Sequence, residues 1–283
     1  MIDQKIAILG GTGKFGVHLG KKLEADNEIY ISGSTVEKAE KIAKENGWKA
    51  GESTEIVKNA DIVLVSVPIS VTVDTIHEVG ENVPSNALFC DITSVKKKPV
   101  EAMSQYSDEV LGMHPMYAPS NSISGQKVVL TPEKGKRWTE FEEFWKENGA
   151  NVHITDPESH DKAMSVVQGL MHFSELVVAE TLRKSAVENE DIETYSSPVY
   201  QLITDLTARM LNQKSRLYHS IQDENPENEE IRENFIESAE EIRSLIGTDD
   251  FEDKFEELKQ QFDLDISQER TDEVIEFMSR EFG

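Results

Sequence analysis

A glycine-rich turn near the N-terminus has the residue types and spacing that hold a phosphate group. The stretch Gly11-Thr12-Gly13-Lys14-Phe15-Gly16 fits the pattern G-x-G-x-x-G and stands between an expected strand, Lys5–Leu9, and an expected helix, Phe15–Glu24. In that position one glycine allows a tight turn, one lets the backbone approach a pyrophosphate, and one lets helix and strand pack closely. The N–H groups at the helix N-terminus can then bind the phosphates. All six residues are therefore candidate contacts of a dinucleotide cofactor.

The residues after the second expected strand bear on which nicotinamide cofactor the turn would hold. Dinucleotide folds that use NAD usually place Asp or Glu there, where it binds the ribose hydroxyls. Here Ile31–Thr35 (ISGST) contains no acid, and the first carboxylate is Glu37. Without that charge a 2′-phosphate is not repelled, and Ser34, Thr35 and Lys38 are candidate ligands for it. No arginine is present for a bidentate contact, so the sequence favours NADP while NAD stays possible.

Two later segments carry polar side chains at the ends of expected strands. Asp91–Lys96 (DITSVK) closes one strand and opens a helix, and Gly112–Met116 (GMHPM) does the same one strand later. Parallel strands present their carboxyl ends at one sheet edge, where ligands bind. His114 is suited to proton transfer there, because imidazole titrates near neutral pH. Further candidate cofactor contacts are Val67, Pro68 and Thr93.

Polar residues also stand out in the second half of the chain. Gln168 and His172 lie four apart and therefore share one face of a helix. The run Ser196–Tyr200 (SSPVY) is followed by Arg209 and Tyr218. The pair on one face could line a site, although His172 could equally be a hydrogen-bonded core histidine.

The elements that must position these residues change character along the chain. Strand-like runs at 5–9, 28–32, 61–67, 87–91, 110–113, 127–131 and 150–155 alternate with helical patterns at 15–24, 36–46, 95–103 and 136–148. Such alternation implies crossover connections and a parallel sheet. Beyond Pro157 only helical periodicity recurs, at 160–187, 195–212, 229–246, 251–262 and 271–282.

We therefore expect an α/β fold with two domains. Residues 1–155 would form a Rossmann-type dinucleotide-binding domain, and residues 156–283 an all-helical substrate and dimerisation domain. The apolar stripes of the helical part exceed what one layer of helices can cover. A homodimer that shares a helical core is the expected assembly.

Composition narrows the class of protein. The 283 residues include 29 Lys and Arg against 54 Asp and Glu, a net charge of −25, which leaves no electrostatic basis for binding nucleic acid or anionic membranes. Residues 221–283 alone hold 22 acidic and 6 basic side chains. We interpret them as solvated helical faces, with adaptation to a salty cytoplasm as the alternative.

Other site types and locations are not expected. No apolar run reaches the ~20 residues of a membrane span, and the N-terminus lacks a secretory signal pattern. The chain is therefore expected to be cytoplasmic. The single cysteine, Cys90, excludes an internal disulfide. His160 and Asp161 are expected to cap the start of a long helix, and no metal site is expected.

Five sequence stretches carry a resemblance to a known family. They are GGTGKFG, DITSVKKKPVEAM, GMHPMYAPS, SHDKAMSVVQGLMHF, and SSPVY with ARMLNQKSRLY, distributed over residues 10–221. In this order they resemble the prephenate dehydrogenases, especially the archaeal and fused bacterial branches. The family oxidises prephenate at its ring C4 hydroxyl, transfers hydride to NAD(P)+ and releases the ring carboxylate as CO₂. The product is 4-hydroxyphenylpyruvate, the precursor of tyrosine.

The resemblance implies a role for each polar residue. His114 would accept a hydrogen bond from the C4 hydroxyl, Ser94 would hold His114 and the nicotinamide in register, and Arg209 would bind a substrate carboxylate. The remaining substrate contacts would be Gln168, His172, Tyr218 and Lys96. Of these, Lys96 would add positive charge near a dianionic substrate, or would simply be a solvated helix residue.

Several other functions stay open at this point. Prephenate and arogenate differ by an amino group far from the hydride, so an arogenate dehydrogenase is possible. The first domain also resembles deazaflavin-dependent NADP reductases, but that resemblance does not account for His114 or Arg209. A non-enzymatic NADP sensor would need neither. Feedback inhibition by tyrosine, the salt optimum and any further role of the acidic helices are equally open.

Overall fold

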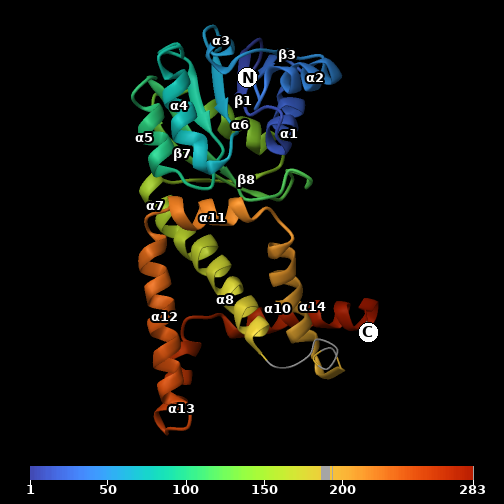
Figure 1. The fold of residues 1–283 in the computed structure, drawn as a ribbon, viewed down its shortest axis with the longest axis vertical. Coiled ribbons are helices and arrows are strands. Elements are labelled where there is room, and N and C mark those ends of the chain that lie inside the picture. Colours follow the sequence, from blue (N-terminus) through green and yellow to red (C-terminus); the bar gives the residue numbers. More distant parts are fainter. Residues whose placement is uncertain (186–191, 193, 283) are drawn as a thin grey trace. The chain divides into compact units, whose positions relative to one another are not determined.

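The chain forms two compact units in the computed structural model, which describes residues 1–185, 192 and 194–282 (Figure 1). The first unit combines residues 1–165 with 219–227, and the second combines 166–218 with 228–283. The chain thus passes from one unit to the other at Ser165–Val166, downstream of the expected boundary at 155/156. The return of 219–227 to the first unit had no signal in the sequence.

The first unit is built on an eight-stranded sheet in the order β3-β2-β1-β4-β5-β6-β7-β8. The strands are β1 (Lys5–Leu9), β2 (Glu28–Ile31), β3 (Lys49–Ala50), β4 (Ile62–Val65), β5 (Leu88–Asp91), β6 (Glu109–Pro115), β7 (Lys127–Lys134) and β8 (Asn151–Ile154). The expected parallel pairing holds from β3 to β6, but β7 runs antiparallel to β6. The reason is that residues 116–126, which join β6 to β7, form no crossover helix.

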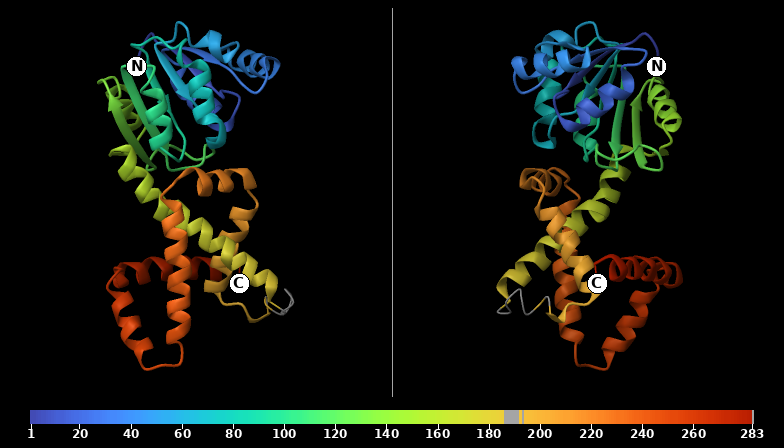
Figure 2. Two further views of the ribbon diagram at one scale, coloured as in Figure 1. Left: turned by 60° about the vertical axis from the view of Figure 1, so that its left-hand side comes forward. Right: turned by 90° about the vertical axis from the view of Figure 1, so that its right-hand side faces the viewer.

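Helices cover both faces of this sheet, as Figure 2 shows. In β1, Ile6 and Ile8 pack on one face while Ala7 and Leu9 pack on the other, as the two-residue period of a strand requires. The first face is covered by α1 (Lys14–Leu23), α2 (Val36–Asn46) and α6 (Thr139–Glu147). The second is covered by α3 (Ser53–Ile56), α4 (Thr72–Gly80) and α5 (Lys97–Met103).

Within residues 1–165 four elements were not expected from the sequence: β3, α3, the 3₁₀ turn η1 (Ile69–Val71), and α4, which follows η1. Both β3 and α3 are very short, so hydrophobic periodicity has little length in which to appear. Helix α4 (TVDTIHEVG) is rich in β-branched residues, which favour strands over helices.

Strand order creates a switch point between β1 and β4. These two strands are neighbours, and the chain leaves them in opposite directions across the sheet. In open α/β sheets ligands bind outside the carboxyl ends of the strands at such a point. The carboxyl ends of β1, β4, β5 and β6 lead directly into the glycine turn, Val67, Asp91–Lys96 and the segment after His114.

The helix that begins the second half of the chain changes its geometry along its length. It starts as α7 (Pro157–Met164), continues through the π-helical segment η2 (Ser165–Leu170) and ends as α8 (Met171–Lys184). The last two residues of the expected span 160–187 lie outside the described residues. Single-turn π segments inside α-helices are frequent at functional sites.

The second unit is helical throughout its described residues. Its elements after α8 are α10 (Pro198–Leu211), α12 (Asn228–Leu245), α13 (Asp250–Lys259) and α14 (Leu264–Phe282), and α11 (Ser215–Glu224) spans the change of unit. Helix α10 begins three residues after the expected start at 195, because Ser197 caps it and Pro198 occupies its first turn. Within this unit α10 packs against both α8 and α14.

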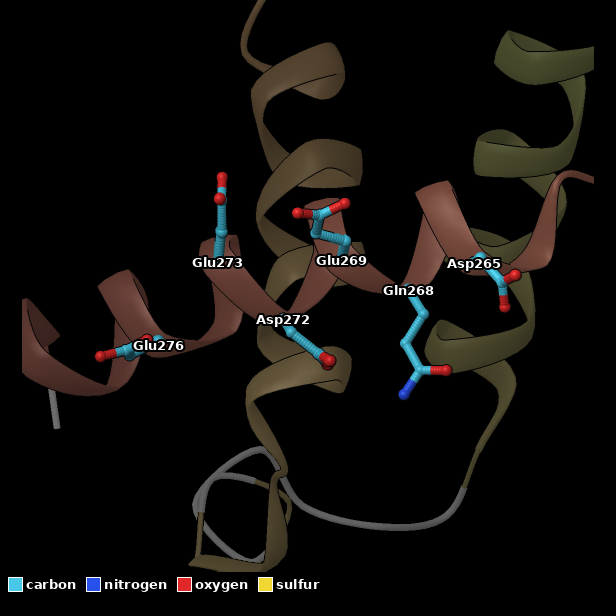
Figure 3. Close-up of a pocket in the computed structure, with 6 residues that line it drawn as sticks. All are labelled: Asp265, Gln268, Glu269, Asp272, Glu273 and Glu276. Atoms are coloured by element: carbon cyan, nitrogen blue, oxygen red, sulfur yellow. The ribbon is translucent and has the colours of Figure 1, made fainter.

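The acidic residues of α14 from Asp265 to Glu276 are exposed. Figure 3 shows the side chains of Asp265, Gln268, Glu269, Asp272, Glu273 and Glu276 projecting from the helix in several directions. Among the described residues, the helices lack the combination of length and apolar character that crossing a membrane requires.

Candidate active site

The sharp bend of the glycine turn is made by a glycine outside the predicted motif. Gly10, which precedes the motif, has a φ of +77°, and a Cβ there would lie 2.5 Å from the Ser66 carbonyl oxygen. A Cβ on Gly16 would lie 2.7 Å from both the Gly10 oxygen and the Gly11 Cα. Gly10 therefore makes the tight turn, and Gly16 allows α1 to pack closely on the turn.

The N-terminus of α1 is shaped to receive an anionic group. Gly13 is the N-cap of the helix, and no side chain caps it. The N–H groups of a first helical turn have no partners within the helix, and these carry the positive end of the helix dipole. A pyrophosphate fits here because the N-cap has no side chain to block its approach. Lys14 is exposed beside this end, while Phe15 packs edge to face on Tyr117.

The residues expected at the ribose are exposed at the start of α2. Ser34, Thr35 and Lys38 all face solvent, and the Thr35 hydroxyl caps α2 by accepting from the Lys38 N–H at 3.3 Å. Thr93 differs, since it is buried and its hydroxyl donates to Asp91 Oδ2 or the Val95 carbonyl. Its hydroxyl is thus engaged within the protein, and a contact between Thr93 and a cofactor stays a prediction.

A buried ion pair follows β5. The ammonium of Lys96 donates to Asp91 Oδ2 at 2.5 Å and to the Met113 carbonyl at 2.8 Å, and neither side chain is exposed. Burial lowers the pKa of Lys96, and the Asp91 carboxylate opposes that change. The interpretation of Lys96 as a solvated residue is wrong. The ammonium of Lys96 is turned into the protein and supports the strand that carries His114. A direct contact between Lys96 and a substrate stays a prediction.

His114 ends a chain of three buried side chains. Its Nδ1 lies 2.9 Å from His160 Nε2, and His160 Nδ1 lies 2.7 Å from Asp161 Oδ1. The sequence prediction that His160 and Asp161 cap a helix is wrong, because Asp156 caps α7 by accepting from the Ser159 N–H. Sequence reasoning overlooked that the adjacent pair His160-Asp161 stands within the first turns of a helix, where both side chains can be buried.

The surroundings of His114 favour its neutral form. Burial, then unfavourable electrostatic interactions with His160 and Lys96, hold the pKa of His114 well below its usual value of 6.5. A neutral imidazole can accept a proton, as a general base must. Ser94 was expected to hold His114, but within the described residues the hydrogen-bond partner of this ring is His160. The role of Ser94, which is half-buried in the turn before α5, remains a prediction.

The other expected substrate residues belong to the second unit. The rings of His172 and Tyr218 meet edge to face with centroids 4.7 Å apart. Burial and the Glu175 carboxylate raise the pKa of Tyr218, and the Arg209 guanidinium opposes that rise. Gln168 Oε1 and His172 Nδ1 are buried atoms without a hydrogen-bond partner among the described residues. Since buried polar atoms are normally paired, these two could accept bonds from a polar ligand.

Two family models match successive parts of the chain. The nucleotide-binding domain of prephenate dehydrogenase matches residues 19–154, and the dimerization domain of prephenate dehydrogenase matches residues 156–263. The second match covers the helical residues that a resemblance to deazaflavin-dependent NADP reductases leaves without explanation.

Relatives and solved structures agree with these matches. A probable arogenate/prephenate dehydrogenase of Methanocaldococcus jannaschii is 36% identical over 87% of this chain and 58% of its own length. The T-protein of Haemophilus influenzae is 31% identical over 91% of this chain and 67% of its own length. This chain thus spans a little over half of the first relative and two thirds of the second.

The fold also matches that of a solved enzyme structure. Prephenate dehydrogenase of Aquifex aeolicus, solved with hydroxyphenyl propionate and NAD+, superposes with a TM-score of 0.76 over 92% of this chain and 98% of that one, at 22% identity. Sequence motifs, family models and relatives agree, and the chain belongs to the prephenate dehydrogenase family.

Proposed function

We propose that this chain oxidises prephenate to 4-hydroxyphenylpyruvate, with transfer of hydride to NADP+ and loss of CO₂. The observation that carries the proposal is His114, a buried imidazole held neutral at the carboxyl end of β6. His114 thus lies at the same edge of the sheet as the glycine turn. Family membership supplies the substrate class.

The chain's own side chains have distinct tasks in this reaction. His114 takes the proton of the C4 hydroxyl as carbonyl character develops at that carbon. The bound nicotinamide supplies the hydride acceptor. Loss of CO₂ then returns its bonding electrons to the ring, and the resulting phenolate oxygen can recover the proton. Arg209 binds a carboxylate of the substrate, a task suited to a planar guanidinium that makes two parallel hydrogen bonds.

The preference for NADP rests on the exposed start of α2. Ser34 and Lys38 are free to contact a 2′-phosphate, and Ile31–Thr35 carries no carboxylate to repel it. Val67 and Pro68, which follow β4 at the switch point, would contact the cofactor from the other side of the glycine turn. A clear preference for NAD in kcat/KM would contradict the cofactor choice and leave the reaction intact.

Arogenate is the second candidate substrate, and the name of the M. jannaschii relative includes both substrates. The deciding assay follows reduced nicotinamide at saturating prephenate or arogenate, each with NAD+ or NADP+. Turnover of arogenate alone would refute the oxidation of prephenate and show that the chain is an arogenate dehydrogenase. Absence of turnover with both substrates would instead favour an NADP-binding sensor.

Two variants test the residue roles separately. His114→Asn should lower kcat by ~10²–10⁴-fold, the usual contribution of a general base, with little change in KM. Arg209→Ala should mainly raise KM, because it removes binding that is present in the ground state. Arg209→Lys should recover only part of that loss, since an ammonium cannot make the forked contact. Near-normal kcat in His114→Asn would refute the catalytic role.

We also propose that the second unit forms a homodimer. It matches the family's dimerization domain, and its helices leave large apolar side chains at least a third exposed. Among them are Val177, Ile203, Leu206, Phe255, Leu258 and Phe277. Exposed apolar side chains in such number favour a contact with another protein surface.

A further inference from the structure

We propose that His160 and Asp161 are positioning residues that hold His114 in one tautomer, with its proton on Nδ1 and its lone pair on Nε2. The inference rests on the proposed oxidation at His114 and adds to it the reason why that ring can act as a base. All three residues belong to the first unit, and each is at most 4% exposed.

The carboxylate of Asp161 fixes the first direction in this chain of hydrogen bonds. Its Oδ1 accepts from the backbone N–H of Lys96 at 2.8 Å, and its Oδ2 accepts from the backbone N–H of Lys97 at 2.9 Å. Backbone N–H groups can only donate, so both oxygens act as acceptors. His160 Nδ1, 2.7 Å from Oδ1, is therefore the donor in the third bond.

The direction of the second bond follows from the first. A neutral imidazole carries one N–H and one lone pair, so a donating Nδ1 leaves His160 Nε2 as an acceptor. His114 Nδ1 lies 2.9 Å from that atom and must donate to it. The proton of neutral His114 is then on Nδ1, and its Nε2 carries the lone pair that a general base needs.

The opposite arrangement is disfavoured. With His160 neutral and His114 protonated on Nε2, two lone pairs would face each other at 2.9 Å. The bond could reverse only if His160 became an imidazolium and donated from both nitrogens. His160 is 2% exposed, and the buried Lys96 ammonium already occupies this region. A second buried cation would add a large desolvation cost.

The chain is also anchored so that the rings keep their orientation. Asn225 donates from Nδ2 to the backbone oxygen of Asp161 at 2.8 Å. The two backbone bonds to the Asp161 carboxylate tie α7 to the N-terminal end of α5. The planes of His114 and His160 meet at 65° with centroids 5.1 Å apart. Loss of His160 would therefore free His114 both to rotate and to change tautomer.

The tautomer can be measured directly, without turnover. The full chain labelled with ¹⁵N-histidine would be studied by long-range ¹H–¹⁵N correlation, with the His114→Gln variant used to identify the His114 signals. We expect a protonated Nδ1 and an unprotonated Nε2 in His114, and a protonated Nδ1 in His160. An unprotonated Nδ1 in His114, or averaging between its two tautomers, would overturn the inference.

Kinetics of two variants and a control complete the test. His160→Phe removes the acceptor while keeping a ring of similar size, and should lower kcat roughly 10²-fold with KM nearly unchanged. His160→Gln offers a carbonyl acceptor to His114 Nδ1 and should recover part of kcat. His153→Phe is the matched control, because His153 is exposed on β8, and it should leave kcat unchanged.

The outcomes separate this inference from the proposed function. If the unmodified chain oxidises neither substrate, the proposed function fails, while the tautomer measurement still decides the state of His114. If the chain is active and both His160 variants keep normal kcat, the positioning role is refuted. If His160→Phe does not fold, His160→Gln and the labelled chain still test the role.

Discussion

Replacing Lys96 by Met should destabilise the first unit far more than the same change at Lys98. Lys96→Met keeps the length of the side chain but removes the ammonium that bonds Asp91 Oδ2 and the Met113 carbonyl. Among the described residues, Asp91 would then keep the two donors of Thr93. Breaking a buried ion pair by removing one partner costs about 3–5 kcal/mol, against a total stability of about 5–15 kcal/mol for a typical protein.

Lys98 provides the control two residues away on the same segment. Its ammonium pairs with Glu224 at 2.9 Å, but its side chain is 47% exposed. Surface pairs of this kind contribute about 0–1 kcal/mol. Lys98→Met should therefore leave the free energy of unfolding nearly unchanged. Residue type and substitution are the same in both variants, so the difference measures burial.

Urea unfolding followed by tryptophan fluorescence is the appropriate assay. Trp48, Trp138 and Trp145 all belong to the first unit, so the signal reports on the unit that holds the pair. Protein concentration must be the same for all variants, because dimerisation would shift the midpoint. The double variant Asp91→Asn with Lys96→Met removes the unpaired charge and should recover much of the loss. Equal effects of Lys96→Met and Lys98→Met would refute the reasoning.

Three further predictions follow from the site and the assembly. Gly16→Ala forces a Cβ to 2.7 Å from backbone atoms, a strain of about 1–3 kcal/mol that corresponds to roughly 5- to 150-fold weaker NADP+ binding, and unchanged affinity in a binding titration would contradict this. Because burial and unfavourable electrostatic interactions with His160 and Lys96 hold the pKa of His114 well below 6.5, kcat/KM should keep its plateau as pH falls through 6.5. An acid limb of the kcat/KM profile centred at or above pH 6.5 would contradict the lowered pKa of His114. The same shift should lower the free energy of unfolding below that pH, since the unfolded chain binds the proton more readily. Light scattering in high salt, which screens the acidic surface, should give twice the 31.9 kDa chain mass, and an active monomer would refute the dimer.

Local sequence patterns determined most of the strands of the first unit and the place of His114 at a strand end. Buried strands such as Lys5–Leu9 are short apolar runs bounded by turn residues, and that signal needs no information from distant parts of the chain. The glycine turn and GMHPM could be placed at strand ends for the same reason. The motif order from residue 10 to residue 221 was sufficient to identify the family.

Only the tertiary structure revealed what surrounds His114. His160 is 46 positions away along the chain, and Asp161 is 65 positions from Lys96, so no local period or spacing connects them. A lysine in a charged run is typical of a solvated helix, and only packing could show that Lys96 is buried against Asp91. Hydrogen-bond direction, burial and the resulting pKa of His114 are properties of groups brought together by folding. The sequence could therefore single out His114 as the candidate base, but its tertiary contacts carry the proposal of which nitrogen is available.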